Sequence, residues 1–352
     1  MTGLRYRAAV LRSSGEPLAI EELLAPELAM GQVLVRLDYS GICRSQLMEV
    51  RGMRGADPWL PHLLGHEGSG RVVAVGPGVS KVEAGDEVIL GWIKGKGLDV
   101  RGPQFQAPSG HINAGPVTTF GEYSIASENR VFLKPASVSG PEATLFGCAL
   151  LTGAGMALQE LAHDEPTSVL LLGLGGVGLS ALIGVLALGP ALVIAADPSP
   201  AKRALALRLG ATHALDPMDP DFVLSVQQVS DGGVQECIES GGTVSSIELG
   251  FACLQPKGGS LVFASHPPAG ERISLDPFEL INGKQIRGSW GGSAEPDVDI
   301  PRLAAIVADS GIDLGLLVDA SYTLDSINQA LADLDGGIVV RPCIDLREAG
   351  EF

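Results

Sequence analysis

The sequence predicts an α/β protein in which a β-rich part is joined to a doubly wound parallel sheet. Up to about residue 135, short runs that alternate apolar and polar residues recur, for example at 33–40 and 70–76, and Gly and Pro separate them. From residue 167 onwards, apolar strand-like runs alternate with helical ones, which is typical of a parallel sheet covered on both faces. The length of 352 residues suits about two domains.

The order of the predicted elements supports this fold class. A helix at 141–161 leads out of the β-rich part, and a helix at 301–311 and a closing strand at 339–346 are expected to pack back on it. Between them the sequence predicts a strand and turn at 169–175, a helix at 176–189, a strand at 191–198, a helix at 200–211, and strands at 213–217, 234–240, 259–265 and 285–290 separated by helical segments.

Charge and cysteine usage narrow the possible function classes. The formal net charge of −17 disfavours binding to nucleic acid or to an anionic membrane surface, so small-molecule substrates are favoured. The five cysteines are widely spread and form no CxxC pair, and the N-terminus lacks the pattern of a secretion signal. We therefore expect a protein of the reducing cytoplasm.

One uncharged stretch, residues 169–196, is long enough on paper to span a membrane, because a spanning helix needs about 20 residues. Six glycines and Pro190 interrupt it. The pattern therefore favours two buried strands with a turn and a buried helix between them, and we expect no membrane span.

A glycine-rich motif predicts a dinucleotide site. The sequence GLGGVG follows an apolar strand and begins an apolar helix, so its glycines allow a tight turn, close approach of a pyrophosphate, and phosphate contact with the helix N-terminus. Asp197 ends the next strand, 19 positions after Gly178; a carboxylate there accepts hydrogen bonds from both ribose hydroxyls and repels a 2′-phosphate, which favours NAD over NADP. The alternative is a structural turn with a helix-capping Asp. With Asp197, the predicted cofactor contacts are Gly173, Gly175, Gly176, Val177 and Gly178.

Two cysteines and one histidine suggest a metal site. Cys43 lies in GICRSQ, His66 follows 23 positions later in GHEGSG, and Cys148 lies in FGCALLTG. Two thiolates and one imidazole leave the fourth position of a zinc ion open, as catalysis requires. Spacing alone does not decide the matter, because a lone buried Cys is usually a small apolar filler and a lone His is usually a core residue.

The flanking sequences strengthen this interpretation. Taken together, GICRS, LGHEGSGRVVAVGPGVSKVEAGDEVI, FGCALLTG and GLGGVG resemble the zinc-dependent medium-chain alcohol dehydrogenases, in order and in spacing, over nearly the whole chain. The resemblance implies a GroES-like catalytic domain formed by residues 1–149 and 290–352. It also implies a central Rossmann domain at 150–289, with the active-site cleft between the two domains.

The resemblance implies roles for single residues. Cys43, His66 and Cys148 match the catalytic zinc ligands, Glu67 matches a glutamate near the metal, and Ser45 matches the hydroxyl that takes the alcohol proton. In that chemistry zinc lowers the pKa of the alcohol, the hydroxyl passes the proton outward, and the hydride goes to nicotinamide.

Other implied contacts lie further from the metal. Arg44 and Arg341 match ligands of the cofactor pyrophosphate, and Lys202 matches a residue on the adenosine ribose. Trp92 falls where an aromatic side chain lines the substrate pocket. The alternative for the three charged residues is a solvated surface position, and for Trp92 it is the core.

The sequence departs from the family pattern in several places. Residues 91–116 are rich in Gly and Pro and predict a long loop or lobe, of a kind that is usually functional or mobile. This lobe lacks the four close cysteines that hold a structural zinc in many relatives. We therefore predict one zinc per chain and a lobe ordered by packing or by a partner subunit.

Two changes affect the proton path and the metal-binding histidine. Gln46 replaces an acid that usually supports this histidine, and Met48 stands where many relatives carry a proton-relay His. Our hypothesis is that His266, on the loop after a Rossmann strand, contacts substrate or supplies the missing proton exit. The sequence identifies no partner for His62, His111, His163 and His213, and it predicts core positions for Cys237, Cys253 and Cys343.

The predicted function is hydride transfer between an alcohol and an aldehyde or ketone, with NAD. A polyol, cyclitol or sugar dehydrogenase of the same superfamily is one alternative, although such relatives commonly carry Glu where Cys148 stands. A zinc-free reductase and a non-catalytic NAD-binding protein are the others. Residues 273–290 fall where relatives pair sheet edges between subunits, so we expect a homodimer or homotetramer.

Overall fold

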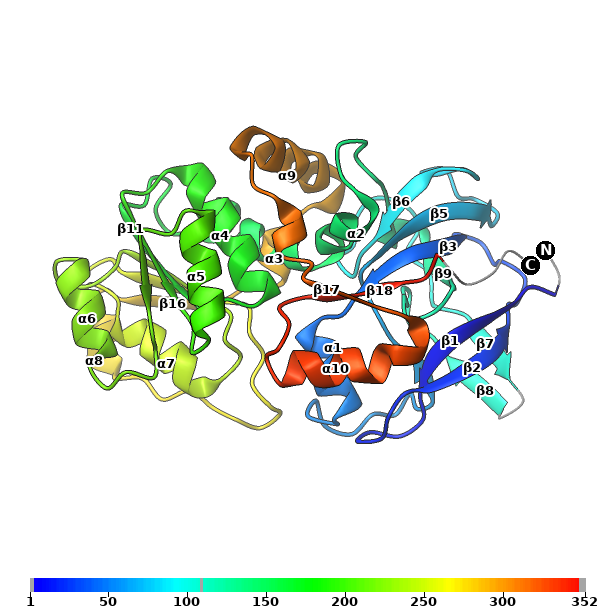
Figure 1. The fold of residues 1–352 in the computed structure, drawn as a ribbon, viewed down its shortest axis with the longest axis horizontal. Coiled ribbons are helices and arrows are strands. Elements are labelled where there is room, and N and C mark those ends of the chain that lie inside the picture. The colour runs from blue at the N-terminus through cyan, green and yellow to red at the C-terminus, as the bar shows by residue number, and fades with distance from the viewer. Residues whose placement is uncertain (1–2, 108–109, 348–352) are drawn as a thin grey trace. The chain divides into compact units, whose positions relative to one another are not determined.

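The computed structural model describes residues 3–107 and 110–347, and the chain divides into two compact units; Figure 1 labels many of their elements. The first unit comprises Met1–Cys148, Glu295–Ala304 and Asp313–Phe352. The second comprises Ala149–Ala294 and Ala305–Ile312. One helix, α9 (Pro296–Ser310), contributes residues to both units.

Two sheets build the first unit. Among the described residues, one is a closed barrel in the order β1-β2-β7-β8-β4, formed by β1 (Arg5–Leu11), β2 (Ala19–Leu24), β4 (His62–Leu63), β7 (Gln104–Ala107) and β8 (Gly110–Asn113). The other has the order β10-β6-β5-β3-β18-β17, with β9 paired to β3, and consists of β3 (Gln32–Gly41), β5 (Gly68–Val75), β6 (Glu87–Leu90), β9 (Tyr123–Ser127), β10 (Val131–Leu133), β17 (Ala320–Tyr322) and β18 (Pro342–Asp345).

Short helices connect these strands. They are α1 (Arg44–Val50), α2 (Gly140–Ala143), α10 (Ile327–Asp335) and the 3₁₀-helices η1 (Glu128–Arg130), η2 (Thr144–Gly147), η5 (Leu314–Leu316) and η6 (Leu324–Ser326). The closing strand β18 pairs with β3, so that Cys343 lies opposite Gly41. The C-terminal part of the chain thus packs on the β-rich part, as the sequence predicted.

Residues 91–116 are not a structureless loop, and this part of the sequence-based prediction was wrong. Strands β7 and β8 pair with each other, β7 also pairs with β2, and β8 with β4. Phe105 and Ile112 face each other across the pair, are 1% and 0% exposed, and pack in the barrel with Tyr6. Each of these four-residue strands has only one fully buried large side chain, which is too short an alternation to recognise in the sequence.

A buried carboxylate binds the part of the lobe that comes before β7. Glu128 is 1% exposed and accepts hydrogen bonds from the N–H groups of Ser80, Lys81 and Leu98, at 2.6, 2.9 and 2.7 Å. Burial opposes its ionisation, but these hydrogen bonds outweigh burial and lower the pKa of Glu128. These contacts join the lobe to other segments of the first unit, and whether they suffice to order it stays a prediction.

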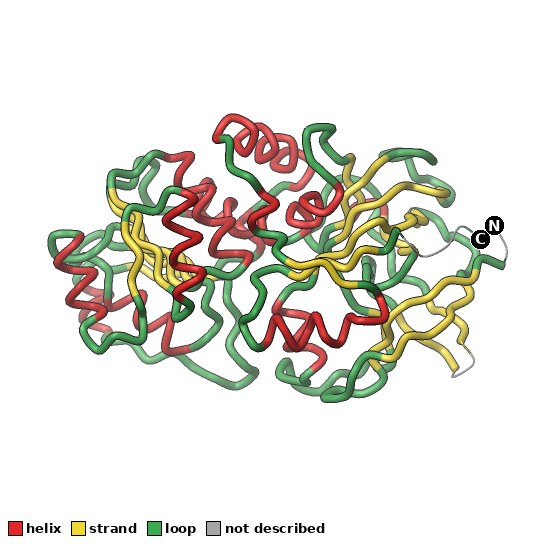
Figure 2. The backbone as a smooth tube through the Cα atoms, in the orientation of Figure 1, coloured by secondary structure: helices red, strands yellow, loops and turns green. Residues whose placement is uncertain are grey.

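The second unit contains the predicted doubly wound sheet. Among the described residues, six parallel strands have the order β13-β12-β11-β14-β15-β16: β11 (Ser168–Leu172), β12 (Leu192–Ala196), β13 (His213–Leu215), β14 (Glu236–Glu239), β15 (Ser260–Phe263) and β16 (Gln285–Gly288). Helices flank these strands (Figure 2). They are α3 (Ala149–Gly155), α4 (Gly176–Leu188), α5 (Pro200–Leu209), α6 (Phe222–Val229), α7 (Val244–Ala252), α8 (Pro277–Ile281), the π-helix η3 (Met156–Glu160) and the 3₁₀-helix η4 (Gly291–Ser293). The strand order reverses at β11, the usual place for a ligand site in such sheets.

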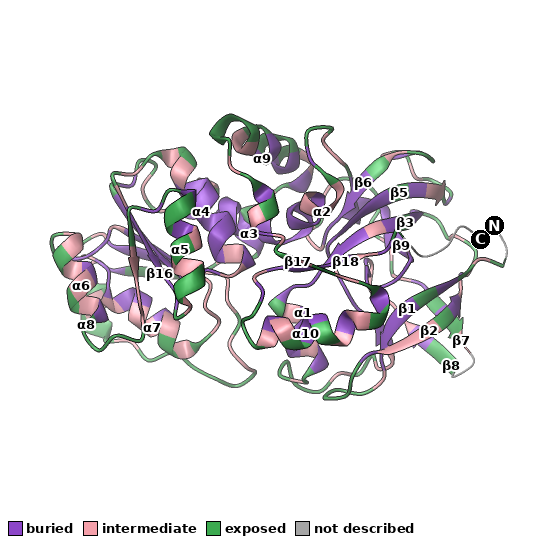
Figure 3. Ribbon diagram, viewed as in Figure 1, coloured by how far each residue is buried: buried purple, intermediate pink, exposed green. Residues whose placement is uncertain are grey.

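The expected helix at 141–161 is broken at Cys148. The segment runs through α2 and η2, stops at Cys148 with φ −152° and ψ −70°, and resumes as α3 and η3. Every residue of α3 is buried, and Figure 3 shows the same for most of α4. The sequence did not reveal the break because the residues on both sides of Cys148 are uniformly apolar.

Within residues 3–107 and 110–347, no single helix combines the length and the apolar composition that a span requires. Only Gly140–Gly147 and Ala149–Glu160, taken together across their break, reach those values.

Candidate active site

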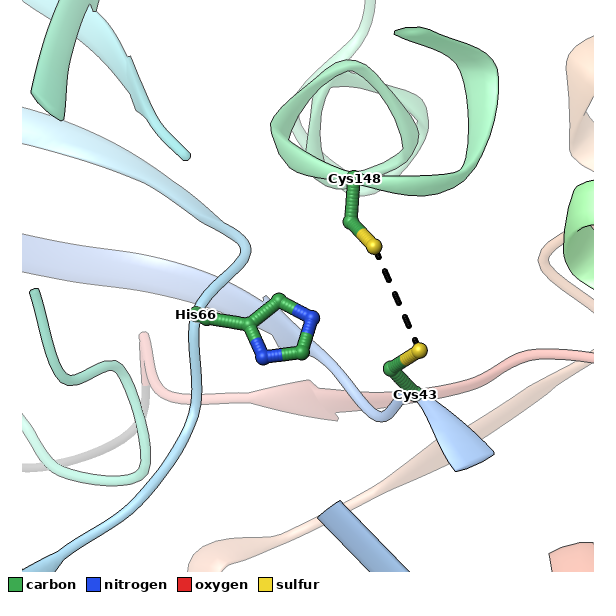
Figure 4. Close-up of side chains that lie close together, drawn as sticks. All are labelled: Cys43, His66 and Cys148. Carbon is green, nitrogen blue, oxygen red and sulfur yellow. Dashed lines mark hydrogen bonds between the residues drawn. The ribbon is translucent and has the colours of Figure 1, made fainter. Parts of the chain in front are cut away.

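Three potential metal ligands come together from separate segments of the first unit (Figure 4). Cys43 follows β3 and is the N-terminal cap of α1, with extended backbone angles of φ −92° and ψ 148°. His66 lies between β4 and β5, and Cys148 lies at the break between η2 and α3. A Cβ on Gly147 would meet Leu90 O at 2.4 Å and Glu67 Cα at 2.9 Å, so only glycine lets Cys148 approach the backbone beside His66.

The distances fit a tetrahedral metal site. Cys43 Sγ and Cys148 Sγ are 4.0 Å apart, and one ring nitrogen of His66 lies within 4.8 Å of both. Two thiolates bound to one zinc ion at about 2.3 Å in a tetrahedral arrangement stand roughly 3.8 Å apart. The sulfur separation therefore matches zinc without rearrangement.

Buried polar atoms at this site lack a hydrogen-bond partner in the part of the chain that the structure describes. His66 Nε2 and Ser45 Oγ are buried without a hydrogen bond among the described residues. Figure 4 shows a ring nitrogen of His66 pointing toward the gap between the two sulfurs. An unpaired buried polar atom is costly, and a bound ion together with an oxygen ligand would supply both missing partners.

The two thiols differ in acidity. The contact with Cys148 lowers the pKa of Cys43 well below the usual value of a thiol, and Arg341 and His66 act in the same direction. The same contact, together with burial, raises the pKa of Cys148 well above that value. One thiol therefore ionises much more readily than the other, and zinc binding would hold both as thiolates.

Glu67 and Arg341 form a buried ion pair next to these ligands. Arg341 Nη2 donates to Glu67 Oε2, and the two side chains are 4% and 1% exposed. Burial raises the pKa of Glu67, and the positive charge of Arg341 opposes this. Glu67 Oε1 has no partner among the described residues, so the pair has spare bonding capacity close to the metal ligands.

Gln46 fixes the backbone before His66. Gln46 is 5% exposed; its Oε1 accepts a hydrogen bond from Gly65 N, and its Nε2 donates to Glu49 Oε2 at 3.3 Å. Both polar groups of the amide are thus engaged away from the His66 ring. The side chain supports the metal-binding loop through its backbone.

The remaining candidates of the first unit are placed as follows. Arg44 is exposed at the start of α1, and Met48 is buried on the same helix. Trp92 is half-buried. Its backbone N–H donates to Gly147 O at 3.3 Å, and its backbone carbonyl accepts from Arg130 Nη1. The backbone of Trp92 therefore lies against the segment that carries Cys148.

In the second unit, the GLGGVG motif forms the turn between β11 and α4. Gly173 has φ +89°, and a Cβ on Gly178 would meet Gly173 O at 1.8 Å. Backbone geometry therefore requires these two glycines. A Cβ on Gly175 would meet nothing within 4 Å, so the open space there is free for a ligand such as a pyrophosphate, next to the N-terminal residues Gly176 and Val177 of α4.

Asp197 holds the motif in place from the end of β12. Its Oδ2 accepts from Leu174 N and its Oδ1 from Ser199 N, both at 2.8 Å. Arg203, which the sequence reasoning missed, donates to Asp197 O at 2.6 Å and pairs with Asp216 at 3.1 Å. Lys202 is half-buried on α5, at the same end of the sheet.

His266 lies on the loop after β15. It is exposed, and its Nδ1 lies 2.7 Å from Pro267 O, so Nδ1 is the hydrogen-bond donor. Nε2 is then the ring nitrogen that can accept a proton or a hydrogen bond. Ser265 next to it donates to Glu239 Oε2 at the end of β14. This contact anchors the loop, and the role of His266 stays a prediction.

The other histidines have partners that the sequence did not reveal. His62 contacts Asp57, His163 contacts Glu236, His111 contacts Gln106 and His213 contacts Thr212. The core prediction for the other cysteines is confirmed, since Cys237, Cys253 and Cys343 are 0%, 0% and 2% exposed.

Comparison with known proteins decides the family. The alcohol dehydrogenase GroES-like domain matches residues 29–136, and the zinc-binding dehydrogenase domain matches residues 176–308. Geraniol dehydrogenase of Castellaniella defragrans is 32% identical, over 96% of this chain and 97% of that protein. The chain belongs to the zinc-binding medium-chain alcohol dehydrogenase family.

Solved structures of zinc-binding alcohol dehydrogenases agree with the fold. An alcohol dehydrogenase zinc-binding domain protein from Burkholderia ambifaria has a TM-score of 0.88 at 30% identity, and benzyl alcohol dehydrogenase from Acinetobacter calcoaceticus has 0.87 at 28%. Each comparison covers 97% of this chain and 99% of the other. The predicted fold class, a GroES-like β-rich part with a Rossmann-type parallel sheet, is confirmed. In this family of zinc-binding dehydrogenases, the Cys43, His66 and Cys148 cluster is the zinc site.

Proposed function

We propose that this alcohol dehydrogenase transfers a hydride between an alcohol and its aldehyde or ketone, with one zinc ion per chain and NAD as cofactor. The convergence of Cys43, His66 and Cys148, with His66 Nε2 buried and unpartnered among the described residues, carries the proposal. Zinc held there supplies a Lewis acid that makes an alcohol more acidic and favours its oxidation.

The chain's own residues handle the proton. Ser45 Oγ is buried without a partner, two positions after Cys43, and we assign it the proton of the substrate hydroxyl. Met48 cannot relay a proton, so the proton leaves through water, the cofactor ribose or another base. His266 is our candidate for that base or for a substrate contact, and Glu67 stays paired with Arg341 near the metal ligands.

The cofactor assignment rests on the second unit. The open space at Gly175 accommodates the pyrophosphate, and nicotinamide supplies the hydride acceptor when NAD is bound. Arg203 is engaged by two carbonyl oxygens and Asp216, so it is not free to neutralise a 2′-phosphate. We further propose that Arg44 and Arg341 bind the pyrophosphate, Lys202 binds the ribose, and Trp92 lines the substrate pocket.

The test of cofactor choice is Asp197→Asn, which removes the charge at nearly the same volume. Because it also turns an NH₂ toward either Leu174 N or Ser199 N, the readout is the ratio between the two cofactors and not the rate with one of them. A difference of about 1–3 kcal/mol in recognition corresponds to roughly 10–200-fold in kcat/KM. We expect the ratio of kcat/KM with NADP to that with NAD to rise at least about 10-fold. An unchanged ratio would remove Asp197 from the specificity argument.

The test of the reaction combines metal content with turnover. We expect about one zinc per chain by elemental mass spectrometry, and NAD reduction with primary alcohols such as geraniol and benzyl alcohol, which the names of two relatives suggest. Sorbitol and inositol test the polyol alternative. NAD binding without turnover on the whole panel would favour a non-catalytic role, and a persistent lack of zinc would favour a zinc-free reductase.

We also propose a homodimer or homotetramer formed through β16. Within the described residues β16 is one of the two edge strands of its sheet, and Phe278, Ile281 and Trp290 around it are 68%, 80% and 83% exposed. An open edge beside exposed apolar side chains favours pairing with another copy. Light scattering should give at least a dimer for the wild type, and Ile281→Lys should shift it toward monomer; a monomeric wild type would contradict the proposal.

A further inference from the structure

A second group of metal-binding side chains lies outside the Cys43, His66 and Cys148 site. Glu49, Asp57 and His62 each offer one ligand atom, and these three atoms lie within 4.8 Å of one another. Glu49 is on α1, His62 is on β4, and Asp57 is on the loop between them. This group contains no sulfur, so its chemistry differs from that of the first site.

The spacing inside the group suits a metal ion. His62 Nε2 is 2.8 Å from Asp57 Oδ2 and 3.9 Å from Glu49 Oε1. Nitrogen and oxygen ligands at about 2.1 Å from one ion, at angles between octahedral and tetrahedral, stand roughly 3.0–3.4 Å apart. The two observed distances lie on either side of this range, so shifts of a few tenths of an ångström would close the site.

The atoms that point away from the centre of the group are held by other partners. Asp57 Oδ1 accepts from Trp59 N at 2.9 Å, and His62 Nδ1 donates to Leu63 O at 2.9 Å. Glu49 Oε2 accepts from Gln46 Nε2 at 3.3 Å. Metal ligands typically have this arrangement, in which an outer hydrogen bond orients each ligand and leaves its second atom for the ion.

Burial and charge agree with a cation at this place. The side chains of His62, Asp57 and Glu49 are 9%, 16% and 24% exposed, so the group is sheltered but water can complete the coordination. Glu49 and Asp57 each offer a carboxylate oxygen to the group, and Arg54 Nη1 lies 3.7 Å from Oε2 of Glu49, the oxygen that is not offered to the ion. Both nitrogens of His62 lie against acceptor oxygens, Nδ1 at Leu63 O and Nε2 at Asp57 Oδ2, and a metal ion on Nε2 would bind both this nitrogen and the carboxylate.

We propose that Glu49, Asp57 and His62 bind a divalent transition-metal ion such as Mn²⁺ or Zn²⁺, in addition to the zinc of the catalytic site. Imidazole and carboxylate ligands suit these ions, whereas the thiolates of the first site select zinc. The second ion is exchangeable because its site is partly open to solvent. It therefore does not add to the zinc that survives dialysis, and the proposal does not depend on which alcohol is oxidised.

The test is a titration of zinc-loaded protein with Mn²⁺ after dialysis, with free Mn²⁺ measured by electron paramagnetic resonance. Mn²⁺ does not displace zinc from thiolates, so it reports on the second site alone. We expect one saturable Mn²⁺ per chain, and at least about 10-fold weaker binding in Glu49→Gln and in Asp57→Asn, since even outer partners of a metal are worth about 10–100-fold. Glu27→Gln, at an exposed carboxylate of the same unit, should bind as the wild type does.

A second measurement needs no variant of the group and decides the matter if a variant fails to fold. Substoichiometric Mn²⁺ should broaden the imidazole NMR signals of His62 before those of His213, which is exposed in the second unit. Equal broadening of both, an absence of saturable binding, or wild-type affinity in Glu49→Gln and Asp57→Asn would each overturn the proposal and leave an ion-pair cluster only.

Discussion

Two places in the first unit bury polar side chains: the catalytic cluster of Cys43, His66 and Cys148, and Glu128, which binds the lobe at 91–116. The hydrogen-bonding groups of these side chains find partners in opposite ways. The Glu128 carboxylate, 1% exposed, accepts three backbone N–H groups and needs nothing further. At the other cluster, His66 Nε2 and Ser45 Oγ are buried and unpartnered within the described residues. Because burying an unpaired polar group is costly, the contacts of Glu128 are complete once the chain folds, whereas those of the catalytic cluster are complete only when a ligand binds.

The comparison teaches how to separate architecture from chemistry in one unit. A buried carboxylate is not evidence of a site by itself, since Glu128 is as buried as Glu67. What distinguishes Glu67 is that Oε1 has no partner within the described residues and that metal-binding side chains adjoin it. We therefore expect changes at the catalytic cluster to affect metal content and rate, and changes at the lobe to affect stability.

The largest expected effect is the loss of a zinc ligand. Cys43→Ala should lose its zinc, and alcohol oxidation should fall more than about 100-fold, because even the outer partners of metal ligands are worth about 10–100-fold. Zinc per chain and kcat are the measurements. Cys253→Ala, at another buried cysteine, is the control and should keep both. A Cys43→Ala variant that keeps its zinc and its activity would show that Cys43 is not a zinc ligand.

Glu128→Gln tests the opposite side of the comparison. An amide group must turn its NH₂ toward N–H donors on one side, so we expect a loss of about 2–3 kcal/mol in the free energy of unfolding at neutral pH, with zinc content unchanged. Denaturant unfolding measures it, and Glu27→Gln on the surface should change little.

The pH dependence of this loss follows from the lowered pKa of Glu128. A carboxylate whose folded pKa is lowered contributes stability that is fully present above the unfolded pKa, about 4.3, and disappears as pH falls through the folded pKa. The gap between wild type and Glu128→Gln should therefore be constant above about pH 5 and narrow below it. A constant gap down to pH 3 would show that charge is not its cause.

The sequence predicted the second unit better than the first, for a physical reason. Strands such as β11 and β12 are buried on both faces, so their continuous apolar runs are visible without any partner. Strands β7 and β8 depend on Phe105 and Ile112 meeting residues of β1 and β2 that are distant in the chain. The break at Cys148 was also invisible, because it depends on the contact of Gly147 with Glu67 and not on a local signal.

The same distinction holds within the site. Flanking motifs marked Cys43, His66 and Cys148, but Glu67 and Arg341 are 274 positions apart and nothing in the sequence pairs them. The sequence predicts that Gln46 removes a support of His66; in the structure its amide oxygen accepts a hydrogen bond from Gly65 N. Contacts between a side chain and a distant backbone atom have no sequence pattern, and such contacts are what the sequence could not supply.

Gln46→Leu tests whether the hydrogen bond from Gly65 N to Gln46 positions the metal-binding loop, and its expected effect on zinc binding is smaller than that of Cys43→Ala. It leaves Gly65 N unpaired, so we expect a loss of about 1–3 kcal/mol in the free energy of unfolding and roughly 10-fold weaker zinc binding. Competition with a chelator measures the zinc affinity. Gln46→Glu keeps an acceptor for Gly65 N but places a second carboxylate against Glu49, so it is combined with Glu49→Gln, and the double variant should retain most of that affinity. A loss in the double variant equal to that in Gln46→Leu would mean that the contact with Gly65 does not position the metal-binding loop.

The smallest expected effect concerns the apolar core of the lobe. Ile112→Val removes one methylene from a side chain that is 0% exposed inside the barrel, which should lower the free energy of unfolding by about 0.5–1.5 kcal/mol. Ile338→Val is the same change at a side chain that is 74% exposed, and it should stay within about 0.5 kcal/mol of wild type. If the two variants were equally stable, packing within the chain would not be what orders residues 91–116, and a partner subunit would have to take that role.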